Sequence, residues 1–271
     1  MKKYIYYCLM ALLLAGCTGA PTAPGRVATR PARVETKAPA DKAPADTTKS
    51  SAPAEKFLAD TTKSSAPAEK VPADTAKSSA PDDEVLKYLE EVALSGFEFG
   101  SAPEVVYKWT HDVDISVSGD LTEADRIAID KTMKDLNELI APRQVNLVPE
   151  GGDITIWYGP SKEFSKRLPS YTPGNMGYFS IRYGRDYSIQ SATILIASEL
   201  DVAARTHLVR EELTQSFGFF QDSRQDPLSI FQQDWTITQT YSELDRAIIP
   251  LLYDERVKPG MSPDSVLAMF S

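Results

Sequence analysis

The chain has 271 residues, of which 42% are hydrophobic and 25% are charged, and its formal net charge is −9. This composition is ordinary for a globular protein. An acidic chain without a basic block is a poor candidate for nucleic-acid binding, which depends on Lys and Arg contacts to phosphates. Both cysteines, Cys8 and Cys17, precede residue 18, so the remaining chain has neither a disulfide framework nor a cysteine-based zinc site.

The first 17 residues have the pattern of an export signal. Two lysines precede a mostly apolar run over 4–15, and the residues just before Cys17 are Leu-Ala-Gly. The run is shorter than the ~18 residues of a membrane-spanning helix and fits a secretory signal peptide. Its end resembles the bacterial lipobox, in which the cysteine is acylated and becomes the first residue of the mature chain. We therefore predict a lipoprotein signal peptide over 1–16, with an ordinary signal peptide as the alternative.

Lipidation of Cys17 implies an exported protein, held on a bacterial membrane by its acyl chains. Thr18 rather than Asp follows the cysteine, which resembles the pattern of outer-membrane lipoproteins. The expected location is therefore the outer membrane, facing the periplasm or the cell surface.

Residues 17–84 have the composition of a spacer rich in Pro, Ala, Ser and Thr. The stretch that begins at Ala45 recurs from Ala59 and, more loosely, from Ala73, with a period of 14 residues. The repeats lack an apolar seam, and their prolines would break a helix. We predict a disordered tether, with binding of the cell wall by the repeats as the alternative.

Residues 85–271 carry a net charge of −11 and are numerous enough for one hydrophobic core. Their hydrophobic pattern predicts, in chain order, a helix over 85–94, a strand over 105–118, a helix that is capped by Asp120 with Glu123 and ends at Pro142, strands over 145–148, 154–158, 178–183 and 191–197, a helix over 201–217, a helix over 242–253 and a short terminal helix. This order predicts an α+β fold, an α/β layer with a twisted, mixed five-stranded sheet.

The helix over 201–217 carries the candidate functional residues. One side of it forms a predicted core stripe, made of Val202, Val209, Leu213 and Phe217. The opposite side mixes Glu211, Glu212 and Gln215 with apolar residues. This mixture favours a cleft or a partner contact, and a purely solvated face is the alternative.

The stretch over 211–222 resembles the metzincin zinc motif, H-E-x-x-H-x-x-G-x-x-H, with every ligand replaced. Glu211, Gln215 and Gln221 stand at the three histidine positions, Glu212 at the position of the general base, and Gly218 at the glycine. Further along, Ser-Ile-Phe over 229–231 resembles the Met-turn. This resemblance implies a zincin-like or metzincin-like fold for 85–271, with the active-site-type helix over 201–217.

A second resemblance is to an uncharacterised bacterial family, domain of unknown function 2927. It rests on a Glu-Glu-x-x-Gln-x-x-Gly-x-x-x-Asp-Ser stretch over 211–223 and a Leu-Tyr-Asp … Pro-Gly-Met ending over 252–261.

A catalytic zinc requires three strong protein ligands and an open position. Glutamine is a neutral oxygen ligand, so we expect no metal and no cofactor. His207 precedes Glu211 by one helical turn, which leaves a site with one histidine and one carboxylate open. The candidate cleft residues are His207, Glu211, Glu212, Gln215, Gln221 and Asp222, and Glu212 is the candidate catalytic residue.

The expected function is that of a lipid-anchored, non-catalytic binding or envelope-associated module. Its expected partners are the membrane, through Cys17, and a protein, peptide or cell-wall component, with no nucleic acid. The alternatives are a peptidase-like hydrolase, which uses Glu212 with an unconventional or absent metal, and a purely structural envelope lipoprotein.

Overall fold

The computed structural model describes residues 81–97 and 102–271. The predicted signal peptide, Cys17 and nearly all of the predicted tether lie outside these residues. The first helix begins at Asp83, within the last residues of that tether. Among the helices described, none is long and apolar enough to cross a membrane.

The element order agrees with the sequence prediction, with modest changes of boundary. The helices are α1 (Asp83–Leu89), continued by a π-helical segment (Glu90–Leu94), α2 (Glu123–Leu139), a 3-10 turn (Ser161–Glu163), α3 (Phe164–Arg167), α4 (Val202–Gln215), α5 (Glu243–Tyr253) and α6 (Pro263–Leu267). The strands are β1 (Val113–Gly119), β2 (Val145–Leu147), β3 (Ile154–Gly159), β4 (Gly177–Tyr183) and β5 (Ile189–Ala197).

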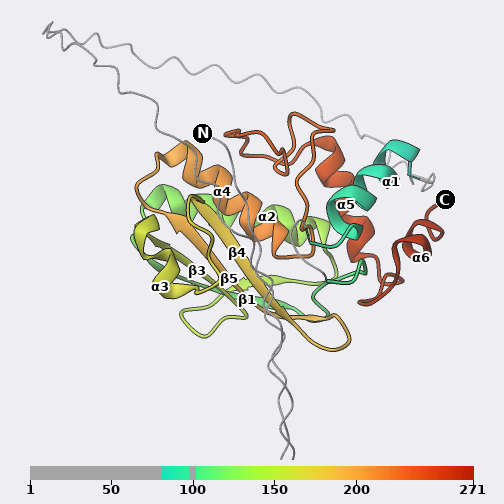
Figure 1. The fold of residues 1–271 in the computed structure, drawn as a ribbon, viewed down its shortest axis with the longest axis horizontal. Coiled ribbons are helices and arrows are strands. Elements are labelled where there is room, and N and C mark those ends of the chain that lie inside the picture. The colour runs from blue at the N-terminus through green and yellow to red at the C-terminus, as the bar shows by residue number, and fades with distance from the viewer. Residues whose placement is uncertain (1–80, 98–101) are drawn as a thin grey trace, which may run out of the picture. The chain divides into compact units, whose positions relative to one another are not determined.

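The five strands form one mixed sheet in the order β2-β1-β3-β5-β4. Strands β2, β1, β3 and β5 run parallel to one another, and β4 pairs antiparallel with β5. Figure 1 shows α2 and α4 crossing one face of this sheet, while α1, α5 and α6 gather beyond one end of it. The predicted α+β fold with a mixed five-stranded sheet is confirmed.

Two predicted boundaries are wrong for identifiable reasons. The strand predicted from residue 105 begins at Val113, because the preceding segment, buried over 106–109 and exposed over 110–112, forms only an isolated bridge between Lys108 and Ser188. The cap of α2 is Thr122 with Asp125 rather than Asp120 with Glu123. Thr122 Oγ1 accepts a hydrogen bond from Asp125 N, and the Asp125 carboxylate accepts one from Thr122 N in return. This reciprocal box joins a cap residue to the third residue after it, a spacing that both pairs satisfy.

The main core lies between the sheet and the helices on its α2/α4 face, and a smaller cluster around Trp157 and Phe164 is separate from it. The edge strand β2 is bonded by a side chain of α2. Asn137 Oδ1 accepts a hydrogen bond from Val145 N at 2.6 Å, and Asn137 Nδ2 donates one to Val145 O at 3.1 Å.

Candidate functional site

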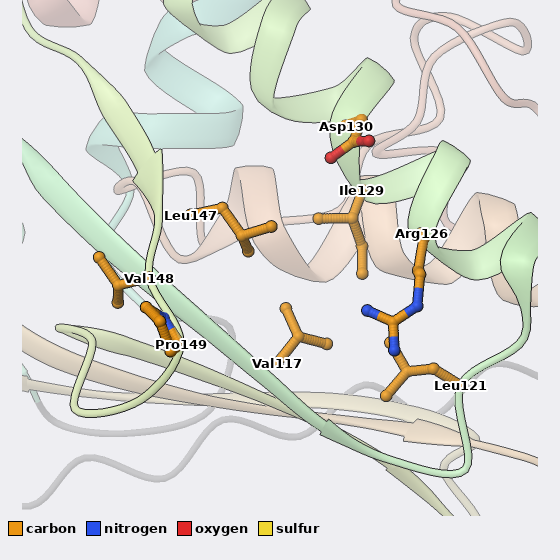
Figure 2. A pocket seen from close by; sticks show the side chains of 8 residues that line it. All are labelled: Val117, Leu121, Arg126, Ile129, Asp130, Leu147, Val148 and Pro149. Carbon is orange, nitrogen blue, oxygen red and sulfur yellow. The ribbon is translucent and has the colours of Figure 1, made fainter.

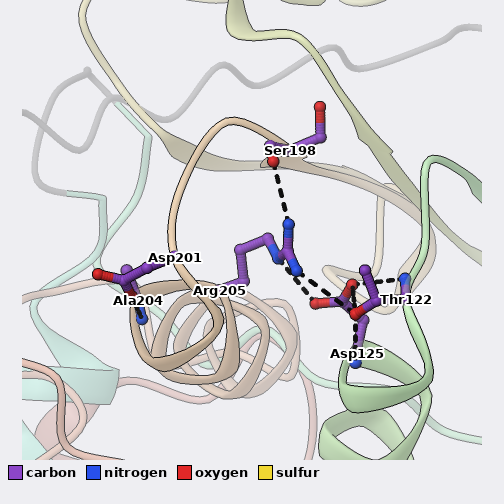
Figure 3. A network of polar contacts seen from close by, with 6 residues as sticks. All are labelled: Thr122, Asp125, Ser198, Asp201, Ala204 and Arg205. Carbon is purple, nitrogen blue, oxygen red and sulfur yellow. Dashed lines mark hydrogen bonds and ion pairs between the residues drawn. The ribbon is translucent and has the colours of Figure 1, made fainter. Parts of the chain in front are cut away.

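The helix α4 is fixed at its first turn by contacts on two sides. Asp201 caps it, accepting a hydrogen bond from Ala204 N at 2.9 Å. Arg205 Nε donates to Asp125 Oδ1 at 3.0 Å, and Arg205 Nη1 donates to the carbonyl oxygen of Ser198 at 3.0 Å. Figure 3 shows this guanidinium between the end of β5 and the start of α2. Arg205 therefore joins α4 to both elements, a role that its sequence context did not indicate.

The polar side of α4 is not solvated. The side chains of Glu211, Glu212 and Gln215 are all 0% exposed. By contrast Val202, which the predicted core stripe included, is 47% exposed, so the stripe is wrong at its first residue. Carboxylates are rarely buried without compensating partners, and the contacts around them therefore decide what this helix can do.

His207 and Glu211 form a buried pair one helical turn apart. His207 Nε2 lies 3.1 Å from Glu211 Oε2, and His207 Nδ1 lies 2.6 Å from the carbonyl oxygen of Thr238. A carbonyl oxygen only accepts, so Nδ1 carries a hydrogen. The contact between His207 Nε2 and Glu211 Oε2 is a hydrogen bond if a second hydrogen is present, carried by either of these two atoms. The Trp235 ring approaches the imidazole edge-on, with the ring centroids 6.2 Å apart.

The carboxylate of Glu212 faces the first residue of the edge strand β4. A Cβ atom added to Gly177 would lie 2.5 Å from Glu212 Oε1 and 2.9 Å from a methyl group of Leu208. A larger residue at this position would require the side chains of Glu212 and Leu208 to move. The position that resembles the general base is therefore set against the sheet edge, inside the protein.

The other two positions aligned with metal ligands also have partners. Gln215 Nε2 donates to Asp222 Oδ1 at 3.0 Å, whereas Gln221 Nε2 donates to the carbonyl oxygen of Gly96 at 3.4 Å. Gln215 Oε1 is buried and accepts no hydrogen bond from the described residues. Gly218 makes the turn between the two glutamines with φ of +110°, a backbone conformation that favours glycine.

The segment that resembles the Met-turn is attached to α5 through Asp245. The Asp245 carboxylate accepts hydrogen bonds from Ser229 Oγ at 2.7 Å, from Ile230 N at 3.1 Å and from Tyr88 Oη at 3.2 Å. Burial raises the pKa of this carboxyl above its ordinary value, although the hydrogen bonds oppose the shift. Phe231, at the methionine position, stacks on Phe219 with ring centroids 5.5 Å apart.

These contacts bring together some of the predicted site residues and separate others. His207 pairs with Glu211, and Gln215 pairs with Asp222, while Gln221 bonds a different segment. Within the described residues there is no group of three or more His, Cys, Asp or Glu side chains placed to hold a metal ion. One imidazole, carboxylates and amides do not match the donor set of a catalytic zinc. The residues present do not fit that ion.

Sequence reasoning missed the partners that bury this helix. Arg210 Nη1 donates to Asp135 Oδ2 at 2.7 Å, and Thr214 Oγ1 lies 2.7 Å from Tyr241 Oη. Both partners lie outside α4, 75 and 27 residues away along the chain. The low exposure of its acids depends on such distant contacts, for which a local pattern gives no signal.

The comparisons with known proteins give a family and little more. No curated protein matches the chain in sequence. One solved structure that it resembles is titled "Crystal structure of myroilysin", with 12% sequence identity and a TM-score of 0.30. The match covers 50% of this chain and 57% of that one. The chain therefore spans little more than half the length of that protein. The family model described as "Protein of unknown function (DUF2927)" matches residues 82–271. The match spans all the helices and strands described above, and it confirms the resemblance seen over 211–223 and 252–261. This chain belongs to the DUF2927 family.

Proposed function

We propose that the chain is a bacterial lipoprotein that displays residues 85–271 as a non-catalytic, zincin-like binding module of the cell envelope. The lipid anchor of this proposal is Cys17, and its partner is a protein, a peptide or a cell-wall component. Support for the export and the anchor comes from the lipobox-like sequence. Support for the zincin-like character comes from the spacing of the stretch over 211–222, which retains the glycine and the helix of the motif.

One observation carries the non-catalytic part of the proposal. Two of the side chains at the metal-ligand positions already make contacts within the protein, because Glu211 contacts His207 and Gln215 contacts Asp222. Both helix positions are 0% exposed. A metal ion at this place would have to displace both of these contacts, and among the three aligned positions it would gain one carboxylate and two weak amide ligands in exchange.

The test is metal analysis of the purified full chain after growth in zinc-supplemented medium. We expect far less than one zinc ion per chain, and no change in melting temperature on adding a chelator. Substitution His207→Ala serves as the check on any metal found. One zinc ion per chain that is lost in this variant would overturn the proposal and favour a site with one histidine and one carboxylate.

The hydrolase reading is the second candidate, because the carboxylate of Glu212 lies against the edge strand β4, where a substrate backbone could pair. Its test compares the wild-type chain with Glu212→Gln on a library of quenched fluorescent peptides. We expect no hydrolysis by either protein. Hydrolysis that Glu212→Gln abolishes, with the melting temperature unchanged, would replace the binding-module proposal by a carboxylate mechanism.

The anchor is tested separately by fractionation of cells that produce the Cys17→Ser variant. We expect this variant to leave the membrane fraction or to accumulate as an uncleaved precursor of higher mass. Cys8→Ser is the matched control, because Cys8 lies within the predicted signal peptide and should be removed with it. Identical fractionation and mass of Cys17→Ser and wild type would exclude lipidation. Separation of inner and outer membranes on a density gradient then locates the anchored chain.

A further inference from the structure

A hollow of about 380 Å³ lies between α2 and the strands β1 and β2, away from the buried face of α4. Its volume falls within the range of about 300–1,000 Å³ that is typical of sites for small molecules. Figure 2 shows the side chains that line it, which come from α2, from β1 and the turn after it, and from the end of β2 with the residues that follow. Neither the sequence motifs nor the family match points to this part of the molecule.

The walls of the hollow are aliphatic. Val117, Leu121, Ile129 and Leu147 line it, together with Val148 and Pro149, and no aromatic side chain contributes. Leu147 is the last residue of the strand β2, and it is nevertheless 52% exposed. A sugar would be expected to need aromatic or hydroxyl partners, so this lining favours an alkyl group over a glycan.

Two opposite charges lie at the hollow without pairing with each other. Arg126 and Asp130 are one helical turn apart on α2, a spacing at which ion pairs commonly form. Within the described residues, however, neither side chain makes an ion pair or a side-chain hydrogen bond. Figure 2 shows the Arg126 guanidinium directed toward Val117 and Leu121, while the Asp130 carboxylate lies on the helix beyond Ile129.

We propose that this hollow binds a medium-chain aliphatic carboxylate, with its alkyl chain on Val117, Ile129 and Leu147 and its carboxylate on Arg126. A guanidinium offers paired N–H donors that match a carboxylate. Asp130 at the rim disfavours a dianion such as a phosphate monoester, which leaves a single negative charge as the better match. This proposal is independent of the proposed function of α4 and of its buried residues.

The test measures binding of radiolabelled octanoate to the full chain in phospholipid nanodiscs by equilibrium dialysis. Partition into the lipid is common to all variants and therefore cancels in the comparison. We expect saturable binding of one octanoate per wild-type chain. Arg126→Met should weaken octanoate binding about fivefold while leaving binding of octan-1-ol unchanged, and Leu147→Asp should weaken both ligands at least as much.

The matched controls are Arg224→Met and Leu228→Asp, because both residues are exposed and neither lines the hollow. They should bind octanoate as the wild type does. Asp130→Asn should strengthen octanoate binding, since it removes the like charge at the rim. The proposal is overturned by absence of saturable binding, by equal effects of Arg126→Met and Arg224→Met, or by tighter binding of octylammonium than of octanoate.

Discussion

His207 Nε2 and Glu211 Oε2 lie 3.1 Å apart on consecutive turns of α4, and both side chains are 0% exposed. This pair occupies the interior at the place where the sequence resembles a metal-binding helix. Substitution of only one member of such a buried pair destabilises the fold strongly, because the remaining group stays in the protein interior without its partner and is poorly solvated there.

We therefore expect His207→Leu and Glu211→Leu each to lower the free energy of unfolding by about 3–5 kcal/mol. The double variant should lose much less than the sum of the two, since it removes both members of the pair. Urea unfolding of the four proteins completes the cycle. Strictly additive losses would show that the two side chains do not stabilise each other.

The ion pair between Arg205 and Asp125 should also make a large contribution to the free energy of unfolding. Arg205→Met removes the guanidinium from a carboxylate that is 0% exposed and from the Ser198 carbonyl. We expect a loss of about 3–5 kcal/mol in the free energy of unfolding, measured by urea denaturation. Arg205→Lys should restore little of it, because an ammonium cannot reproduce the planar fork of donors.

Arg224→Met is the control for the same change of side chain. Arg224 and Asp234 approach to only 3.8 Å, with side chains 68% and 77% exposed. Removal of a solvent-exposed pair should cost less than about 1 kcal/mol. Equal losses in the Arg205 and Arg224 variants would contradict the structural role of Arg205.

Two glycines separate the effect of backbone conformation from the effect of crowding. Gly218 and Gly174 have similar φ values of +110° and +106°, but an added Cβ would clash with the carbonyl oxygen of Tyr107 at Gly218 and meets nothing within 4 Å at Gly174. Gly174→Ala should cost about 1–2 kcal/mol for the φ value alone. Gly218→Ala should cost clearly more. Comparable melting temperatures for the two variants would mean that the turn after α4 is not crowded.

Lys108 predicts a dependence of stability on alkaline pH. Its Nζ donates to the carbonyl oxygens of Leu252, Asp254 and Val257 while the side chain is 4% exposed. Burial, reinforced by two neighbouring cations, lowers the pKa of this ammonium to about 8, from 10.5 in the unfolded chain. Between these values the unfolded chain binds more protons than the folded one, so the contribution of Lys108 to stability rises with pH.

The measurement is the free energy of unfolding from pH 7 to pH 10.5 for the wild type and for Lys108→Met. The difference between them should move in favour of the wild type by up to about 3 kcal/mol over this range. Below pH 8 it should be constant. A difference that is constant over the whole range would show that the lysine titrates normally, and one that moves the other way would show that folding raises its pKa.

The sequence predicted the layered fold because the elements follow local rules. Alternation of Val113, Ile115 and Val117 indicates the strand β1, short apolar runs indicate β3 and β5, and Asp201 and Ser242 begin α4 and α5 as capping residues. The predicted cap of α2 was wrong because two equally spaced pairs, Asp120 with Glu123 and Thr122 with Asp125, both fit the pattern, and only the structure shows that Thr122 and Asp125 bond each other. The start of β1 failed because the apolar segment before it serves the core without pairing as a strand.

The sequence predicted where the candidate site lies in the chain, but it did not predict that the acidic side chains of the site are buried. The motif spacing locates the turn at Gly218 and the end of α4. The burial of this side of α4, however, depends on the contact of His207 with Thr238, on the approach of Gly177 to Glu212, and on contacts with α2 and Tyr241. These contacts join segments far apart in the chain, so a helix that carries adjacent acids looks the same in sequence whether it faces solvent or the interior.

The amide of Asn137 gives β2 a neighbour that is not a strand. The amide hydrogen-bonds to both the N–H and the carbonyl group of Val145. These two backbone groups are therefore not available to an extended segment of another molecule. Unblocked sheet edges act as templates for aggregation between chains. A single side chain of α2 thus protects the parallel edge from growth by strand addition, and β2 can stay only three residues long without a covering loop at that point.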